Sequence, residues 1–377
     1  MAVELNFSPN EFANRLSRVR ARMKERGIDL LIVDGIEAMT WLSGFGIGDT
    51  LWRAAIVPVS ADPFLVVRSL DVLPARERSW FKDIVAFRDW DNPVTCVVDE
   101  LKRRKLLKGT IGLDLGSDSM PVARFVELRS AVGRQPVDFG PALWELRWTK
   151  STKEIAYFRT AAKIADAGIL AAVSAIRIGG RQRDIARAVS DKYLELGGDS
   201  GPVGHVTSGT DWDSVHTHEN NQPLERGAIV HIELCPRVNQ YSSRIMRSCV
   251  VGEPTKAQVN AARSLIDVQD AQLAAMKPGA LARDIDALVR EPLVRLGLRP
   301  SYDNITGYTL GVVPNGTQRL SDFTHIFTPV ANWVLEPGMV QHMYATAAGF
   351  AVSETVLVTE TGIERLTQAD RKLFSAD

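Results

Sequence analysis

The sequence is poor in cysteine. Its 377 residues contain only Cys96, Cys235 and Cys249, an odd number without a C-x-x-C spacing. This pattern argues against a disulfide framework and against a structural zinc site, and it fits a reducing compartment. The sequence also lacks a run of 18 apolar residues, and its first residues lack the apolar core of a signal peptide. We therefore expect a cytoplasmic protein that does not span a membrane.

An excess of charge of either sign is also missing. Lys+Arg and Asp+Glu both total 45, and the pI is near 7.0. Without a basic field to hold a phosphate backbone, a nucleic-acid partner is not expected. The sequence contains neither a glycine-rich phosphate loop nor the G-x-S-x-G motif of many serine hydrolases. What it does contain is ordinary for a globular protein, with 45% hydrophobic and 24% charged residues.

The first part of the chain alternates predicted strands with predicted helices, which indicates an α/β domain. Within it, two apolar segments (54–59 and 64–67) flank Ser60-Ala61-Asp62-Pro63 and predict a β-hairpin. Ser151-Thr152-Lys153-Glu154 is a capping-box pattern at the start of a long amphipathic helix. We place the domain boundary there and expect one domain over 1–150 and a second over 151–377.

The second domain shows a repeated order of elements. Two predicted helices (154–176 and 181–195) precede a strand-rich stretch over 203–252, and a helical stretch over 256–296 precedes strands over 303–361. This order predicts an α+β domain made of two similar halves.

Three passages carry a resemblance to a known family. They are the linker helix that begins Lys150-Ser151, the segment from Ser208 through His216 and on over 229–254, and the segment 334–367 with its L-x-P-G-M and V-L-V-T-E-x-G-x-E-x-L-T phrases. They resemble the pita-bread family of creatinase and the Xaa-Pro peptidases, and together with a creatinase-type N-terminal domain the resemblance covers nearly the whole chain. The resemblance implies a small creatinase-type N-terminal α/β domain, a pita-bread C-terminal domain with internal pseudo-duplication, and a homodimer.

Metal-dependent members of that family hold two metal ions with two aspartates, a histidine and two glutamates. Aligned on Tyr241 and Arg247, the five positions hold Glu233, Arg244, Tyr308, Tyr344 and Glu354 in this sequence. A guanidinium places a permanent positive charge where a cation would sit. Tyrosines, with a pKa near 10, are poor ligands at neutral pH, and two carboxylates alone rarely hold a transition metal. We expect no metal and no other cofactor.

The resemblance is therefore closest to the metal-independent branch, which includes ectoine hydrolase and creatinase. Creatinase carries a catalytic glutamate where Met246 stands here, which counts against creatine as the substrate. The branch implies a hydrolase that cleaves a non-peptide C–N bond, such as that of a cyclic amidine, amide or ureido group, in a small nitrogen-containing molecule.

The expected catalytic residues are His216, Glu233 and Glu354. His216 lies in a polar loop and matches the family histidine that contacts substrate; an imidazole, with a reference pKa near 6.5, moves protons in either direction at neutral pH. Glu233 and Glu354 lie in apolar strands, where alternate side chains would face the cleft as an acid/base or nucleophile pair. A solvated loop histidine and an ion pair that only holds the strands together are the structural alternatives.

The expected substrate-binding residues are Arg53, Arg244, Arg247, Tyr308, His342 and Tyr344. The arginines would hold an anionic end of the substrate, Arg53 by reaching over the neighbouring subunit's cleft, and the tyrosines would donate hydrogen bonds as charge develops. For Arg53, an ordinary loop arginine is the slightly favoured alternative. For the tyrosines, side chains that only fill an emptied metal pocket are an equal alternative.

The sequence leaves several alternatives open for the site and the function. His218 and Glu219, close to His216, would suit a metal cluster but are more typical of a polar surface. The same acid/base residues would serve a lyase or isomerase. A metal-dependent enzyme like the Xaa-Pro dipeptidases, or a non-catalytic binding scaffold, are further possibilities; the retention of His216 beside carboxylates favours an enzyme over a scaffold.

Overall fold

The computed structural model describes residues 4–46, 51–209, 211, 215–314 and 323–377. The chain divides into two compact units. The first consists of Met1–Arg147 and Val312–Gln318, and the second of Trp148–Gly311 and Arg319–Asp377.

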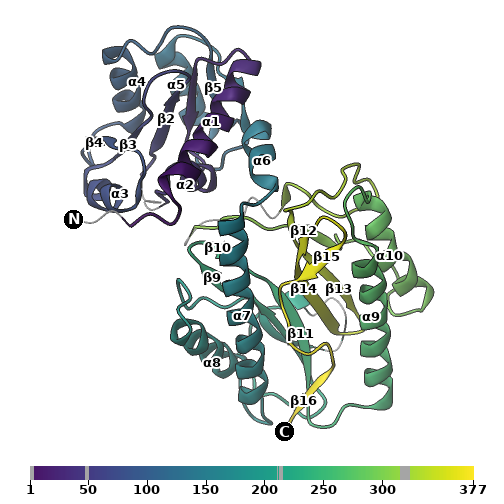
Figure 1. The fold of residues 1–377 in the computed structure, drawn as a ribbon. Coiled ribbons are helices and arrows are strands. Elements are labelled where there is room, and N and C mark those ends of the chain that lie inside the picture. The colour runs from purple at the N-terminus through teal and green to yellow at the C-terminus, as the bar shows by residue number, and fades with distance from the viewer. Residues whose placement is uncertain (1–3, 47–50, 210, 212–214, 315–322) are drawn as a thin grey trace. The chain divides into compact units, whose positions relative to one another are not determined.

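The N-terminal unit is an α/β layer structure around a six-stranded sheet of order β4-β3-β2-β1-β5-β6 (Figure 1). Strands β2 and β3 are antiparallel, with Ile56 opposite Phe64, which confirms the predicted hairpin. At the start of helix α1, the Ser8 side chain accepts a hydrogen bond from the Glu11 amide. The elements are α1 (Pro9–Glu25), β1 (Leu30–Val33), α2 (Ile36–Ser43), β2 (Ala54–Pro58), β3 (Phe64–Arg68), η1 (Ser69–Asp71), α3 (Val72–Arg78), β4 (Asp83–Phe87), α4 (Pro93–Arg103), β5 (Ile111–Leu113), α5 (Val122–Val132), β6 (Val137–Asp138) and α6 (Gly140–Trp148).

A buried carboxyl group lies at the end of β1 in this unit. Asp34 is fully buried, and the indole Nε1 of Trp52 donates a hydrogen bond of 2.9 Å to its Oδ2. Burial, reinforced by the nearby Asp114 carboxylate, raises the pKa of Asp34 to about 6 despite this hydrogen bond. Because native Asp34 holds its proton more tightly than the unfolded chain does, stability falls as pH rises from about 4 to about 6 and stays reduced above that range.

Replacing Asp34 with Asn should therefore stabilise the N-terminal unit at pH 8. The amide cannot ionise and still accepts the Trp52 hydrogen bond, so the gain is at most about 3 kcal/mol, the equivalent of the pKa shift. The gain should shrink through pH 6 and vanish near pH 4. Thermal unfolding followed by tryptophan fluorescence at several pH values measures it, and a gain of equal size at pH 4 and pH 8 would show that ionisation is not its cause.

The C-terminal unit repeats the order of two helices followed by strands, as the sequence predicts. Both helix pairs begin with a capping box, made by Ser151 and Glu154 in α7 and by Thr255 and Gln258 in α9. The elements are α7 (Thr152–Ala175), α8 (Gln182–Glu195), β7 (Val206–Gly209), β8 (Ile229–Leu234), β9 (Arg237–Val238), β10 (Tyr241–Ser242), β11 (Ile245–Val251), α9 (Lys256–Ala275), α10 (Ala282–Arg295), β12 (Gly307–Thr309), β13 (Val340–Ala347), β14 (Phe350–Val358), β15 (Ile363–Arg365) and β16 (Phe374–Ala376).

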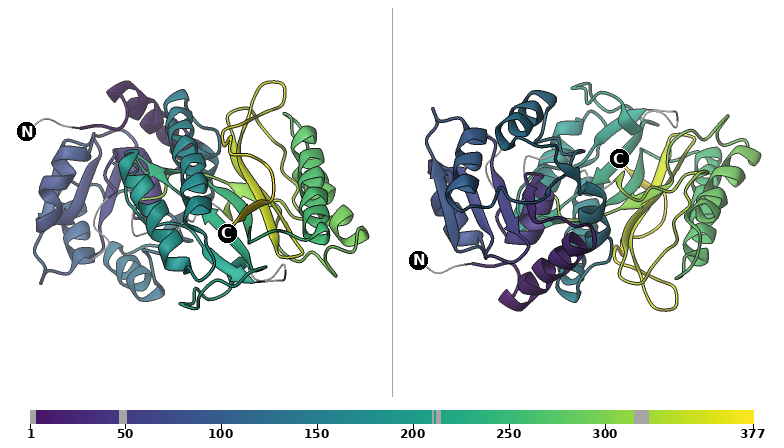
Figure 2. Two further views of the ribbon diagram at one scale, coloured as in Figure 1. Left: turned by 90° about the horizontal axis from the view of Figure 1, so that it is seen from below. Right: turned by 90° about the horizontal axis from the view of Figure 1, so that it is seen from above.

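Most strands of this unit form one large sheet whose main path is β12-β13-β14-β11-β8-β7, with β15 beside β14 and β16 beside β11. Strands β9 and β10 pair with each other in a separate two-stranded sheet. Helices α7 and α8 pack on the β7, β8 and β11 side of the sheet, and α9 packs on β13 and β14. The two helix pairs lie beside their strands in every view (Figures 1 and 2).

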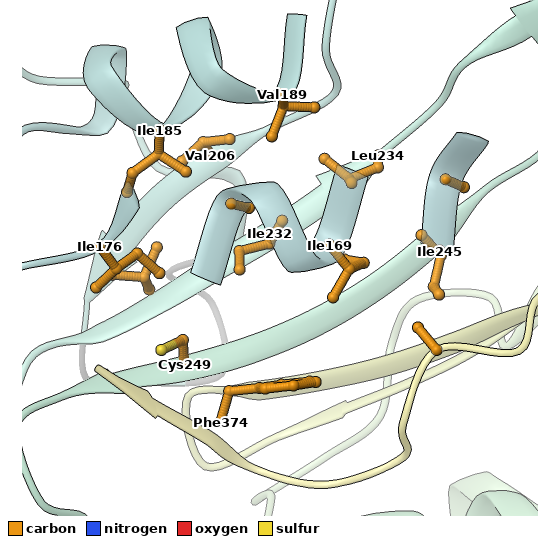
Figure 3. Packing of buried hydrophobic residues seen from close by; sticks show 14 of the residues in the cluster. Ile169, Ile176, Ile185, Val189, Val206, Ile232, Leu234, Ile245, Cys249 and Phe374 are labelled. Atoms are coloured by element: carbon orange, nitrogen blue, oxygen red, sulfur yellow. The ribbon is translucent and has the colours of Figure 1, made fainter. Parts of the chain in front are cut away.

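The residues of β8 alternate between two environments. Ile232 and Leu234 belong to the apolar core that also contains Ile169 of α7 and Val189 of α8 (Figure 3). Since successive side chains of a strand point to opposite faces, Glu233 points away from this helix layer. The other face of the sheet is therefore the place to look for a polar site.

One further property of the helices bears on the sequence expectations. Among the described residues, no helix is both long and apolar enough to cross a membrane.

Candidate active site

A cavity of about 580 Å³ lies within the C-terminal unit. Five of the predicted site residues line it, and the remaining lining residues come from the loops and strands around them. The lining residues are His205, Val215, His216, Glu233, Arg244, Met246, Asp303, Asn304, Ile305, Tyr308, Phe323, Tyr344 and Thr346.

The pairing of four strands builds the floor of this cavity. Glu233 of β8 is opposite Met246 of β11, Met246 is opposite Ser353 of β14, and Ser353 is opposite Tyr344 of β13. Directly opposed residues of antiparallel strands share one face of the sheet. This row therefore brings Glu233 and Tyr344, which are more than a hundred residues apart in sequence, to the same side.

Glu233 is the buried carboxylate of the cavity. It is 3% exposed, and its two oxygens have different neighbours. The Arg244 guanidinium lies 3.7 Å from Oε1, whereas Nε2 of His216 and Nε2 of His231 each lie 3.9 Å from Oε2. Burial alone would raise the pKa of Glu233, but His231 and Arg244 outweigh it and hold that pKa below the usual range of a glutamate. Glu233 is therefore an anion at neutral pH.

Two imidazoles stand at the mouth of the cavity beside this anion. The side chain of His216 is 68% exposed, and its ring stacks on that of His205 with centroids 4.9 Å apart. His205 is held there by the backbone, because its carbonyl accepts a hydrogen bond of 2.8 Å from the Glu233 amide. Gly204 permits this close approach, since a Cβ at that position would lie 2.1 Å from the Glu233 carbonyl oxygen.

Two tyrosines line the β12 and β13 side of the cavity and form what we call the tyrosine wall. Tyr308 of β12 packs edge-on against Tyr344 and also lies under the Arg244 guanidinium, which is 5.2 Å from its ring centroid. Burial raises the pKa of Tyr344, so its phenol keeps its proton, and the Asn304 amide donates a hydrogen bond of 3.3 Å to the phenol oxygen. This wall therefore offers hydrogen-bond donors rather than anionic ligands.

His342 points to the same face of β13 as Tyr344 but does not line the cavity. It is fully buried, stacks on Tyr344 and meets Tyr308 edge-on, and its Nε2 is 2.7 Å from the Ser353 hydroxyl. Its expected direct contact with substrate is not what the geometry favours, because two tyrosine rings and Ser353 surround it.

The structure does not bring the two predicted catalytic carboxylates together, because Glu354 faces away from the cavity that Glu233 lines. Its neighbour Ser353 is the residue in the Glu233–Tyr344 row, so Glu354 points to the helix side of the sheet. There Arg247 donates to it at 2.9 Å, Arg371 donates at 3.2 Å, and the Thr367 hydroxyl donates as well. Glu354 is fully buried in this network.

Arg247, which was expected to bind substrate, also lies outside the cavity. Its guanidinium is 1% exposed and donates hydrogen bonds to Glu354 and to the backbone carbonyls of Met246, Ser353, Ala369 and Asp370. Arg247 and Glu354 therefore tie the C-terminal segment to the sheet, as the structural alternative proposed.

Three other sequence predictions fall outside the cavity of this unit. Arg53 precedes β2 in the N-terminal unit and is 6% exposed. Its predicted reach into a second subunit's cleft stays a prediction. His218 and Glu219 are exposed, and the group of possible ligands around His216 among the described residues contains His205 and Glu233 instead.

Comparison with known families accounts for both units. Residues 15–149 match the Creatinase/Prolidase N-terminal domain, and residues 156–360, more than half of the chain, match metallopeptidase family M24. The chain belongs to family M24. This assignment confirms the predicted two-domain fold and places the chain in a family of hydrolases.

Individual relatives of this M24 protein have different activities. It is 26% identical to the Xaa-Pro dipeptidase of Pyrococcus furiosus over 363 residues, which covers 96% of this chain and 99% of that protein. It is 25% identical to the ectoine hydrolase of Halomonas elongata over 413 aligned positions, which covers 99% of both chains. In structure it is similar to the prolidase of Thermococcus sibiricus, with a TM-score of 0.85 and 22% identity. The match covers 97% of this chain and 99% of that prolidase.

The two-metal centre that the family name implies does not fit the side chains of this M24 protein. The structure corrects the sequence alignment at one position, because β14 presents Ser353 rather than Glu354 to the cavity side. Of the five side chains at the family's ligand positions, only Glu233 is a carboxylate, and the Arg244 guanidinium lies 3.7 Å from it. The other three side chains are the neutral hydroxyls of Tyr308, Tyr344 and Ser353. A pair of divalent ions needs several anionic or imidazole ligands, which this set lacks.

Sequence reasoning missed several cavity residues, of which His205, Asp303 and Asn304 are the most polar. Asp303 is exposed and accepts a hydrogen bond of 2.5 Å from the Ser301 hydroxyl. Asp303 and Asn304 belong to a polar loop shortly before β12, the strand of Tyr308, and that position near a predicted site strand was the available signal. For His205, the signal was a second histidine upstream of His216 in the same polar stretch.

Proposed function

We propose that this M24 protein is a hydrolase that works without the two-metal centre and cleaves a non-peptide C–N bond, such as that of a cyclic amidine, amide or ureido group, in a small polar molecule. The observation that carries the proposal is the pairing of Glu233 with Arg244 where metal-dependent relatives would hold cations. A permanent guanidinium beside the one carboxylate of the donor set opposes metal binding and neutralises the buried anion.

The chemistry that we propose uses His216 and Glu233 to activate water. Their nearest polar atoms are 3.9 Å apart, too far for a direct hydrogen bond but close enough for both to contact one water molecule. His216 accepts a proton from the water as its oxygen bonds to the substrate carbon. The C–N bond then breaks, and the same proton passes from the imidazolium to the leaving nitrogen. Ionised Glu233 stabilises the imidazolium during this transfer.

The tyrosine wall supplies the other half of the reaction. The Tyr344 phenol, kept protonated by burial and oriented by Asn304, can donate to the heteroatom on which negative charge develops. The Arg244 guanidinium, between Glu233 and Tyr308, suits an anionic end of the substrate. A cavity of about 580 Å³ accommodates a small molecule with both features.

The relatives support hydrolysis and leave two candidate substrate classes. Similarity to an ectoine hydrolase supports a cyclic amidine, whereas similarity to an Xaa-Pro dipeptidase makes peptide hydrolysis the second candidate. The side chains at the ligand positions favour the cyclic amidine, because one carboxylate paired with Arg244 is a poor ligand set for the metal ions that a dipeptidase of this fold would use. A homodimer in which Arg53 completes the site is part of the same proposal.

The test is turnover in ¹⁸O-labelled water with a small panel of substrates. Chelator-treated protein is incubated with ectoine as a cyclic amidine, an N-acetyl diamino acid, a ureido acid and an Ala-Pro dipeptide, and products are analysed by mass spectrometry. The proposal predicts that a non-peptide substrate gives a product with one ¹⁸O atom from water. Cleavage without ¹⁸O incorporation would indicate a lyase, and turnover of Ala-Pro alone would overturn the substrate class.

A further inference from the structure

The cavity contains a group of potential metal ligands that differs from the family's set. A nitrogen of His205, a nitrogen of His216 and a carboxylate oxygen of Glu233 all lie within 4.8 Å of one another. Two of these residues, His205 and His216, come from the mouth of the cavity rather than from the five aligned positions. Two imidazoles and one carboxylate are a common ligand set for a single transition-metal ion, with room left for water.

Glu233 provides a second, independent observation. Arg244 lies beside Oε1, whereas Oε2 is buried and has no hydrogen-bond partner among the described residues. Nε2 of His216 and Nε2 of the buried His231 each lie 3.9 Å from that oxygen. An unsatisfied carboxylate oxygen in a 97% buried group is costly, and a cation on the imidazole side would satisfy it without displacing Arg244.

We propose that His205, His216 and Glu233 form a site for one divalent transition-metal ion, such as Zn²⁺, and that binding of this ion inhibits the enzyme. The inhibition rests on the proposed function, because a nitrogen that coordinates a metal cannot accept a proton from water. Arg244 limits the affinity, since its positive charge lies close to the same carboxylate. The site selects Zn²⁺, Co²⁺ or Ni²⁺ over Mg²⁺ and Ca²⁺, which prefer oxygen ligands.

The binding test uses untagged, chelator-treated protein titrated with Co²⁺ and followed by its visible absorption and by calorimetry. One Co²⁺ per chain should bind, and Zn²⁺ should displace it. Substitution of His205 with Asn removes one ligand; because even outer-shell changes at metal sites cost roughly 10–100-fold in affinity, the variant should bind at least about tenfold more weakly. His216→Asn should do the same, and the exposed neighbour His218→Asn should bind like the unmodified protein.

The two halves of the proposal fail in different ways. Absence of Co²⁺ binding, or equal binding by the folded His205→Asn and His216→Asn variants, would overturn the site while leaving the metal-free activity untouched. With a substrate identified, Zn²⁺ should reduce turnover with the same concentration dependence as Co²⁺ displacement, and less effectively in His205→Asn. A Zn²⁺ or Co²⁺ ion that binds through these residues and raises turnover would overturn inhibition and, with it, the proposed metal-free reaction.

Discussion

Replacing His216 with Ala should reduce turnover by about 10²–10⁴-fold, the usual effect of losing a proton-transfer group. His216 is the exposed imidazole nearest to ionised Glu233, so the variant keeps the anion and loses the base. Since the His216 side chain is 68% exposed, the substitution removes little packing, and the unfolding midpoint should stay close to that of the unmodified protein. Steady-state kinetics on the substrate found in the ¹⁸O experiment measures the effect.

His218→Ala is the matched control for this prediction. His218 lies two residues further along the same loop, is exposed and does not line the cavity. It should therefore leave the rate nearly unchanged. Normal turnover in His216→Ala, or an equal loss of turnover in both variants, would contradict the assignment of His216 as the proton-transfer residue.

Replacing Glu354 with Gln should destabilise the C-terminal unit by about 3–5 kcal/mol, the cost of breaking a buried ion pair from one side. The amide keeps the shape of the side chain but leaves the guanidinium groups of Arg247 and Arg371 without their shared carboxylate. The midpoint of urea unfolding, followed by circular dichroism, should fall accordingly. This outcome would place Glu354 in the structure rather than in the chemistry.

Glu364→Gln serves as the comparison for Glu354. Glu364 also pairs with an arginine, Arg159, but both side chains are about 40% exposed, and such surface pairs contribute roughly 0–1 kcal/mol. If Glu354→Gln unfolds like Glu364→Gln yet loses turnover, Glu354 acts in catalysis and the orientation of β14 described above is contradicted.

Much of the fold was predictable because its signals are local. The capping box at Ser151 and Glu154, the hairpin around Asp62-Pro63 and the repeated order of helices and strands each depend on a few neighbouring residues. The structure reproduces these features within a few residues of the predicted positions.

The sequence predicted a site residue correctly only where the alignment assigned it to the side of its strand that faces the cavity. Glu233, Arg244, Tyr308 and Tyr344 line one cavity as expected. Glu354 was misplaced by a single residue, and in a strand a shift of one residue moves a side chain to the opposite face of the sheet. The apolar pattern of β14 offered no correction, because this strand is buried on both faces and reads as a continuous buried run.

The remaining cavity residues depend on tertiary structure. His205 approaches Glu233 through a backbone pairing made possible by Gly204, and Asn304 reaches Tyr344 from a loop forty residues earlier. Neither contact follows from spacing or periodicity, since both join segments that come together only when the sheet forms.

The most direct test of metal-free hydrolysis is the turnover rate of protein stripped with a strong chelator, dialysed into metal-free buffer and checked by elemental analysis. With Arg244 beside Glu233 and with Tyr308, Tyr344 and Ser353 at three ligand positions, the stripped enzyme should contain less than a stoichiometric amount of zinc, manganese, iron, cobalt and nickel. It should turn over its non-peptide substrate at least as fast as the untreated protein. Loss of activity on stripping, with recovery on addition of Mn²⁺, Co²⁺ or Zn²⁺, would contradict the account.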